Sequence, residues 1–271
     1  MLIRYDARAN VLVSTKGHPF DRAAFCDLFD SFRGMTWTHV EQPATAALLS
    51  PEGTADFAAL VFYDVPGIQF RTPAPPDLIA PTETMKAGFR ALLAAGKPMV
   101  FLHHAIAGWP LWDGYAEAIG ARFFYQPGRY KGRDYPDSGY LFPVTYRAVP
   151  QGAHPVLAGL EGGFEVTDEL YLFEMLEAGI VPLLAADHPF DRGHFYSAAH
   201  ALNGRMWTRD GWDHPPGTPL IAWARAAGNA PIVVIQCGND GATFGNPAFR
   251  RLLRNAIDWV TSAEAAAWAR G

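Results

Sequence analysis

The sequence is poor in cysteine: Cys26 and Cys237 are the only two in 271 residues. Two thiols are too few for a disulfide framework or a four-thiolate zinc site, so a reducing compartment is the default expectation. The chain has no run of about 18 consecutive apolar residues, which a membrane-spanning helix would require. Its start, Met1 to Asp6, lacks the charged-then-apolar order of a signal peptide. We therefore expect a cytoplasmic protein that has no membrane partner.

Positive charge is also in short supply. Lys and Arg total 22 against 27 Asp and Glu, a net charge of −5, and no basic run is present. The electrostatic footprint of a nucleic-acid-binding protein is therefore missing. Charged residues make up only 18% of the chain and hydrophobic residues 49%, which excludes intrinsic disorder. The expectation is one globular domain over residues 1–271, long enough to bury roughly 70% of its unfolded surface.

Four familiar motifs are absent. The sequence has no Gly-x-x-x-x-Gly-Lys-Ser/Thr, no Gly-x-Gly-x-x-Gly after a strand, no His-Glu-x-x-His and no Gly-x-Ser-x-Gly. The sequence therefore contains none of the motifs that usually indicate nucleotide binding, zincin proteolysis or the common esterase mechanism. No motif requires a cofactor, whereas a bound divalent metal and a homo-oligomeric state both stay open.

What the sequence does contain is an alternation of short apolar runs with segments of helical period. This pattern predicts an α/β fold, a doubly wound, mostly parallel sheet with helices on both faces. The expected strands are 10–15, 37–40, 57–63, 98–102, 142–148, 181–186, 220–223 and 232–235. Helices are expected over 21–33, from the cap Thr82 to Gly96, and after Asn246-Pro247. The Pro- and Gly-rich segment 65–81 is too irregular to assign.

Polar side chains follow several of the predicted strands, where an open parallel sheet binds its ligands. His103 and His104 come directly after the strand at 98–102, and His18 follows the first strand. Two adjacent imidazoles cost desolvation unless each finds a partner, so at least one is expected to line a functional pocket. The alternatives are a hydrogen bond from one of them to a backbone carbonyl and a solvated turn at His18. Cys237 is expected to be a small buried residue, because no elbow motif surrounds it.

The segment Asp168-Glu169-Leu170-Tyr171 places two carboxylates beside an aromatic hydroxyl. Adjacent side chains on an extended segment face opposite ways, so only one of the two acids is expected to enter a given pocket. A carboxylate that meets a histidine gives a general acid/base pair or half of a metal site. A solvated acidic pair on the surface is the alternative.

Residues 187–217 are expected to form an inserted lobe or loop over the site. Trp207 and Trp212 would offer ring faces to a polyol there, although either ring would serve equally well as core filler. The spacing His188-x-x-Asp191-x-x-His194 has a metal-like composition, but nothing in the sequence fixes it on one helix face.

In order and spacing, a series of short motifs resembles the ThuA-like (trehalose-utilisation) family. The motifs are Lys16-Gly17-His18, Leu102-His103, Trp112-x-x-Tyr115, Ala118-Ile119-Gly120, His154-Pro155, Asp168 to Tyr171, Pro219 to Trp223, Gly238, and Phe244 through Pro247-x-Phe249 to Trp259. The resemblance implies a flavodoxin-like domain of the class I glutamine amidotransferase type and a link to disaccharide or keto-sugar metabolism.

The resemblance also shows two departures. Amidotransferases carry a nucleophilic Cys at the elbow after the central strand, whereas this chain has His103 there, so glutamine hydrolysis through a thioester is not expected. Family members usually show Gly-His after the last strand, and here the pair is Gly238-Asn239. This exchange replaces a titratable nitrogen by an amide.

The leading hypothesis is a ThuA-like enzyme that acts on a small carbohydrate or keto-sugar. His103 and Glu169 would exchange protons. The expected substrate-binding residues are His18, His104, Asp168, Tyr171, Asn239, Trp207 and Trp212. Two alternatives stay open: a non-catalytic sugar-binding or assembly protein, and a metal-dependent hydrolase or lyase that uses His18, His103 and Glu169.

Overall fold

The computed structural model describes residues 9–70 and 75–271. Met1 to Asp6, on which the signal-peptide expectation rests, and residues 71–74 of the unassigned segment lie outside the described residues. Within the described part of the chain, ten strands form one sheet in the order β10-β9-β11-β13-β14-β6-β3-β1-β2, with β12 paired to β9.

One half of the sheet is parallel and has the strand order of flavodoxin-like folds, β2-β1-β3-β6-β14. Its strands are β1 (Ala9–Thr15), β2 (Met35–Glu41), β3 (Ala59–Phe62), β6 (Met99–Leu102) and β14 (Ala230–Ile235). β3, β6 and β14 are buried at every residue, as strands covered on both faces must be. The predicted fold class is confirmed.

The other half of the sheet is antiparallel and was not predicted as such. It consists of β13 (Leu220–Ala227), β11 (Val181–Ala186), β9 (Gly139–Pro150) and β10 (Phe164–Leu172), with the short β12 (Tyr196–Ser197) at its edge. β9 is longer than the predicted strand at 142–148. β10 escaped assignment because the buried polar Asp168 interrupts its alternation of apolar residues.

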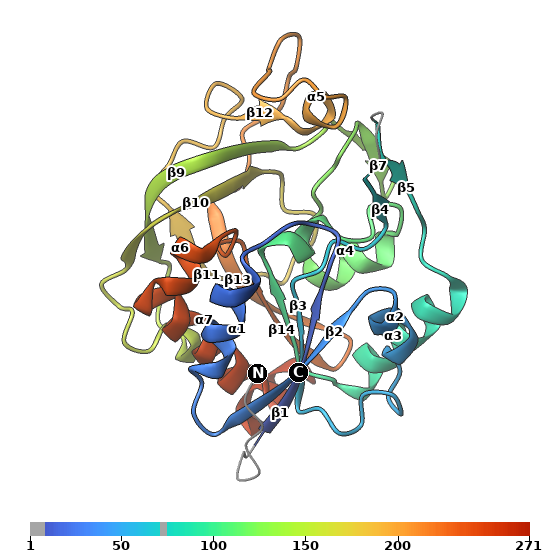
Figure 1. The fold of residues 1–271 in the computed structure, drawn as a ribbon, viewed down its shortest axis with the longest axis vertical. Helices are drawn as coiled ribbons and strands as arrows, with labels where there is room; N and C mark the ends of the chain where they lie inside the picture. The colour runs from blue at the N-terminus through green and yellow to red at the C-terminus, as the bar shows by residue number, and fades with distance from the viewer. Residues whose placement is uncertain (1–8, 71–74) are drawn as a thin grey trace.

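Helices cover both faces of the sheet (Figure 1). On one face lie α1 (Arg22–Asp30), α6 (Gly241–Gly245), α7 (Pro247–Val260) and α8 (Ala263–Ala269); on the other lie α2 (Ala44–Leu48), α3 (Glu83–Ala95) and α4 (Asp113–Ile119). Successive β1 residues alternate between the two cores, because Val11 and Val13 pack with the first group and Leu12 with the second.

The helix boundaries follow the capping residues. Thr82 accepts a hydrogen bond from the backbone of Met85 and starts α3, which ends at the left-handed Gly96, as predicted. Asn246 caps α7 ahead of Pro247. The helix predicted over 21–33 is shorter in the structure, because Asp21 is its cap and its last residue is Asp30.

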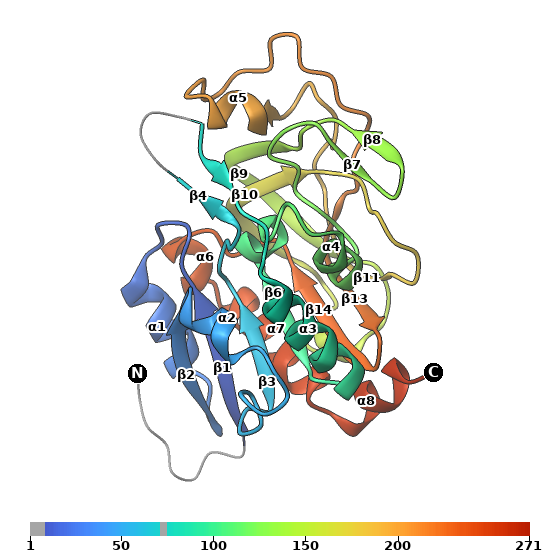
Figure 2. The ribbon, with the colours of Figure 1, turned by 90° about the vertical axis from the view of Figure 1, so that its right-hand side faces the viewer.

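The 187–217 segment lies beyond the carboxyl ends of the parallel strands (Figure 2). It includes β12 and the short helix α5 (Ala198–Leu202). The remaining short elements are β4 (Ile68–Gln69), β5 (Asp77–Leu78), β7 (Gly128–Tyr130), β8 (Arg133–Tyr135), η1 (His103–Ala107) and η2 (Pro155–Leu157). None of the helices in the described residues has the length and hydrophobicity that crossing a bilayer requires.

Candidate functional site

A cavity of about 650 Å³ opens where the parallel strands end. The loop after β1, the start of η1, strand β10 and helix α5 all contribute to it. Its lining residues are Lys16, Gly17, His18, Pro19, Arg22, Val65, Phe70, His104, Ala107, Phe123, Tyr125, Tyr140, Glu169, Tyr171, Ala198, Ala201, Leu202 and Met206. Four of the predicted site residues, far apart in the sequence, therefore converge on one pocket: His18, His104, Glu169 and Tyr171.

His103 occupies a strained turn directly behind the pocket floor. It follows β6, begins η1 and has φ +43°, a left-handed conformation that is uncommon for a residue with a side chain. Its ring is fully buried. The Nδ1–H group donates to the backbone carbonyl of Gln236, while Nε2 lies 3.1 Å from Glu169 Oε2 and 3.0 Å from the Tyr171 hydroxyl. Three contacts, one from the residue after β14 and two from β10, thus fix the orientation of one imidazole.

The electrostatics of His103 favour its charged form. Burial alone lowers the pKa of His103, but the hydrogen bond and negative charge of Glu169, together with the charge of Asp168, outweigh burial and raise the pKa above its ordinary value. His103 and Glu169 therefore lie in ion-pairing geometry, with the imidazole ring buried and the carboxylate reaching the pocket.

Asp168 and Glu169 point in opposite directions, as an extended segment predicts. Asp168 is fully buried and accepts hydrogen bonds from three backbone N–H groups, those of Glu169 (2.8 Å), Gly238 (2.6 Å) and Asn239 (3.0 Å). Burial raises the pKa of Asp168, and the charge of His103 and these N–H groups oppose that shift. Asp168, which was expected to bind substrate, does not line the pocket and instead ties β10 to the loop after β14.

His104 and His18 form a pair of imidazoles beside His103. The His104 ring centroid lies 4.1 Å from that of His18 and 4.5 Å from that of His103. Burial, together with the charges of His103 and His18, holds the pKa of His104 well below its usual value, and the Asn239 side chain opposes this shift. Among the described residues, neither ring nitrogen of His104 has a hydrogen-bond partner of ordinary geometry. His104 is therefore a neutral, buried group with free donor and acceptor capacity.

His18 and Asn239 differ in how far they reach the pocket. His18 lines the cavity and uses Nδ1 to bond the Pro19 carbonyl at 2.8 Å, and burial lowers its pKa. Asn239 does not line the cavity. Its backbone N–H binds Asp168, and its carbonyl accepts from the Tyr63 hydroxyl at 3.2 Å. Asn239 therefore links the loop after β14 to Asp168 and Tyr63 outside the cavity.

The two tryptophans expected to bind substrate lie outside the pocket. Trp212 is only 5% exposed, packs in the core and donates its indole N–H to the Asp137 carbonyl. Trp207 is 50% exposed and packs against Tyr140 and Tyr196. The 187–217 segment does reach the site, but it does so through α5.

Several pocket residues escaped the sequence analysis. α5 and its C-terminal flank contribute Ala198, Ala201, Leu202 and Met206, and the residues before β9 contribute Phe123 and Tyr125. Alanine and leucine in a short helix carry no chemical signal in a sequence. Aromatic residues alternate with Gly, Pro and Arg over 122–148, a pattern that favours extended segments but does not specify which rings face a cavity.

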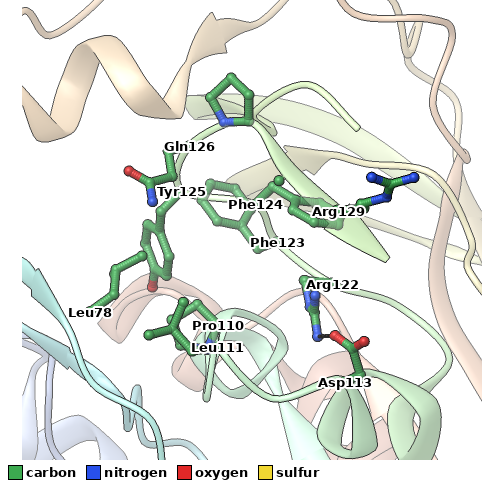
Figure 3. Close-up of a pocket in the computed structure, with 12 residues that line it drawn as sticks. Leu78, Pro110, Leu111, Asp113, Arg122, Phe123, Phe124, Tyr125, Gln126 and Arg129 are labelled. Atoms are coloured by element: carbon green, nitrogen blue, oxygen red, sulfur yellow. Dashed lines mark hydrogen bonds and ion pairs between the residues drawn. The ribbon is translucent and has the colours of Figure 1, made fainter. Parts of the chain in front are cut away.

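A second hollow of about 230 Å³ adjoins the pocket across Phe123 and Tyr125, which line both (Figure 3). Its charged floor is already neutralised, because Arg122 donates to Asp113 at 2.7 Å. This hollow lacks the coupled imidazoles and carboxylates of the larger pocket, so the chemistry is assigned to the latter.

One group of side chains could hold a metal ion. The donor atoms of His103, His104 and Glu169 lie within 4.8 Å of one another, and no other such set occurs in residues 9–70 and 75–271. The set includes His104 where the sequence analysis named His18. The hydrogen bond from His103 Nδ1–H to a backbone carbonyl is the contact that usually orients a metal-binding imidazole.

Comparison with known proteins assigns the family. The model of the ThuA (trehalose utilisation) family matches residues 10–260. The chain belongs to the ThuA family. A search of curated proteins finds no match for this ThuA protein.

Solved structures agree on the fold. A ThuA-like protein of Bacteroides uniformis is 14% identical with a TM-score of 0.63, over 96% of this chain and 94% of its own. A ThuA-like protein of Parabacteroides merdae is 13% identical with a TM-score of 0.64, over 94% and 90%. PurLQS of Thermotoga maritima is 6% identical with a TM-score of 0.51, over 93% and 98%. The ThuA protein thus has a class I glutamine amidotransferase-like fold.

Proposed function

We propose that this ThuA protein is a cytoplasmic enzyme that transfers protons on a small carbohydrate or keto-sugar. The observation that carries the proposal is the ion pair between His103 and Glu169, held at 3.1 Å on the floor of a cavity large enough for a sugar. Active sites are where burial and specific charge partners are arranged to perturb pKa values, and His103 combines both with backbone strain.

The geometry divides the work between the two residues. Glu169 reaches the pocket, and His103 engages its Oε2 from behind. Glu169 Oε1 is then the atom that accepts a proton from a sugar hydroxyl or from a carbon next to a carbonyl, and the same oxygen returns it. His103 is a positioning residue that holds the carboxylate in one orientation. His18 and Tyr171 orient the hydroxyl groups of the substrate.

Amidotransferase chemistry has no nucleophile here. His103 stands at the elbow, and an imidazole there forms no thioester. The thiol of Cys237, in the loop after β14, is fully buried, and burial raises its pKa well above the ordinary value. A thiol kept protonated and out of solvent does not attack an amide.

The test is hydrogen exchange catalysed at a keto-sugar. The protein is incubated in D₂O with ketohexoses and oxidised disaccharides, and deuterium incorporation and products are followed by NMR. Glu169→Gln should lose at least about 100-fold in rate, since general acid–base catalysis contributes that much or more. Glu174→Gln, whose side chain pairs with Arg133 outside the pocket, is the matched control and should keep the wild-type rate. Sugars that raise the unfolding temperature but return unchanged, without exchange, would instead indicate a binding protein.

A metal-dependent reaction is the second candidate, favoured by one observation. His104 is buried with both nitrogens free of ordinary hydrogen bonds, next to His103 and Glu169. Two imidazoles and a carboxylate suit Zn²⁺, Mn²⁺ or Fe²⁺. In this case Glu169 would be a ligand rather than a proton carrier, and His103 a ligand rather than a positioning residue. Elemental analysis and Zn²⁺ titration of wild type and His104→Ala decide the point, since an active protein free of metal removes this candidate.

A further inference from the structure

The pocket has two chemically different sides. Its floor carries His104, Glu169 and Tyr171, which present nitrogen and oxygen atoms. Another part of the lining, which we call the wall, comes from α5 and the residues after it. Helix α5 lies beyond the strand ends (Figure 2). The four wall residues are Ala198, Ala201, Leu202 and Met206. Their side chains contain no donor, and the Met206 sulfur is their only heteroatom.

The tyrosine next to this wall adds no free polar group. Tyr140 lines the pocket, but its hydroxyl accepts a hydrogen bond from the Trp207 backbone N–H at 2.8 Å. The same hydroxyl donates to the Met206 sulfur at 3.8 Å. The donor and one acceptor position of the hydroxyl are therefore used, and Tyr140 has no N–H or O–H group left to donate to a ligand.

The wall is fixed in place before any ligand arrives. The buried carboxylate of Asp137 accepts hydrogen bonds from the Ser197 hydroxyl at 2.6 Å and from the Ala199 N–H at 2.9 Å. The Ala198 N–H donates to the Ser138 carbonyl. Because α5 is anchored at its N-terminus, its apolar residues form a preorganised surface.

We infer that the substrate is a glycoside with an apolar aglycone, its sugar on the polar floor and its aglycone on the α5 wall. This inference rests on the proposed function. A sugar ring placed against the wall would lose water from its hydroxyl groups without gaining partners, which is unfavourable. An apolar group in the same place removes apolar surface from water on both sides. A disaccharide of two fully hydroxylated rings therefore fits this pocket less well.

The test compares matched ligands by isothermal titration calorimetry on the full chain. The probes are methyl glucoside and phenyl glucoside, each as the α and the β anomer, and trehalose. Phenyl glucoside should bind about tenfold more tightly than methyl glucoside, because the phenyl ring buries additional apolar surface. Equal affinities of the two glucosides, or tighter binding of trehalose than of phenyl glucoside, would overturn the inference.

Two variants assign the effect to the wall. Met206→Gln, at a half-exposed residue, should weaken phenyl glucoside about threefold and leave methyl glucoside unchanged. Leu111→Gln, at an equally exposed residue in the second hollow, should change neither affinity. A Met206→Gln effect that is equal for both glucosides refutes the placement of the aglycone. If methyl glucoside and trehalose bind but phenyl glucoside is not preferred, this inference alone is refuted. If none of the sugars binds, the proposed function is refuted as well.

Discussion

Asp168 is the buried carboxylate on which the floor of the site depends, and its replacement tests the geometry directly. One oxygen, Oδ1, accepts from the N–H groups of Glu169 and Asn239, and the other, Oδ2, accepts from Gly238. Asp168→Ala removes all three bonds and leaves the donors buried. Each unsatisfied buried group costs about 1–3 kcal/mol, so we expect the free energy of unfolding to fall by roughly 4 kcal/mol.

Asp168→Asn distinguishes the hydrogen bonds at Oδ1 from the one at Oδ2. The amide oxygen retains the two bonds at the Oδ1 position, but the NH₂ group then faces the Gly238 N–H, donor against donor. The expected loss is about 2 kcal/mol, half that of alanine. The assay is urea unfolding followed by circular dichroism and tryptophan fluorescence. Asp213→Ala, at a highly exposed aspartate, is the control and should change stability by less than about 0.5 kcal/mol. If Asp168→Asn lowered the free energy of unfolding as much as Asp168→Ala, or did not lower it at all, the assignment of this energy to the three hydrogen bonds would be wrong.

Three further predictions concern stability. Burial raises the pKa of Asp64 to about 6 from the ordinary 3.8. The folded state therefore binds this proton more tightly than the unfolded state does. The resulting contribution to the free energy of unfolding is present at low pH and is lost as the pH rises from about 4 to 6. This contribution is about 3 kcal/mol, and Asp64→Asn should abolish it. The measurement is the urea unfolding midpoint at pH 4 and at pH 7. Gly17→Ala should cost at least about 2 kcal/mol in thermal unfolding, because φ is +100° and the new Cβ would lie 2.5 Å from the Val65 carbonyl oxygen. Trp212→Ala should cost about 3–5 kcal/mol and Trp207→Ala less than about 1, which chemical denaturation will check; similar losses would contradict their placement.

The parallel half of the sheet was predictable because its sequence signals are local. Runs such as 98–102 and 232–235 are apolar throughout, since helices bury both faces of these strands. Thr82 and Asn246 cap their helices by contacts with residues two or three positions away. Each of these features is determined within a few residues, so one sequence is enough to find it.

The antiparallel half and the pocket wall depend on partners distant in sequence. β10 pairs with β9 and not with a neighbour in the parallel half, and no local pattern specifies this choice. Trp207 and Trp212 lie in similar polar surroundings in the sequence, yet only Trp212 reaches the core. The two tryptophans could therefore not be distinguished without knowing where β12 and α5 attach.

Reasoning from position in the fold brought His18, His104, Glu169 and Tyr171 to one pocket. The central strand β6 ends in a sharp turn that holds His103 at φ +43°. Backbone strain of this kind persists only when surrounding contacts fix it, and the Gln236 carbonyl, Glu169 and Tyr171 supply those contacts. The fold thus offers one strained position at which a side chain is presented rigidly. The imidazole at this position contacts the Glu169 carboxylate at 3.1 Å, so the same turn that strains the backbone places His103 against the pocket carboxylate.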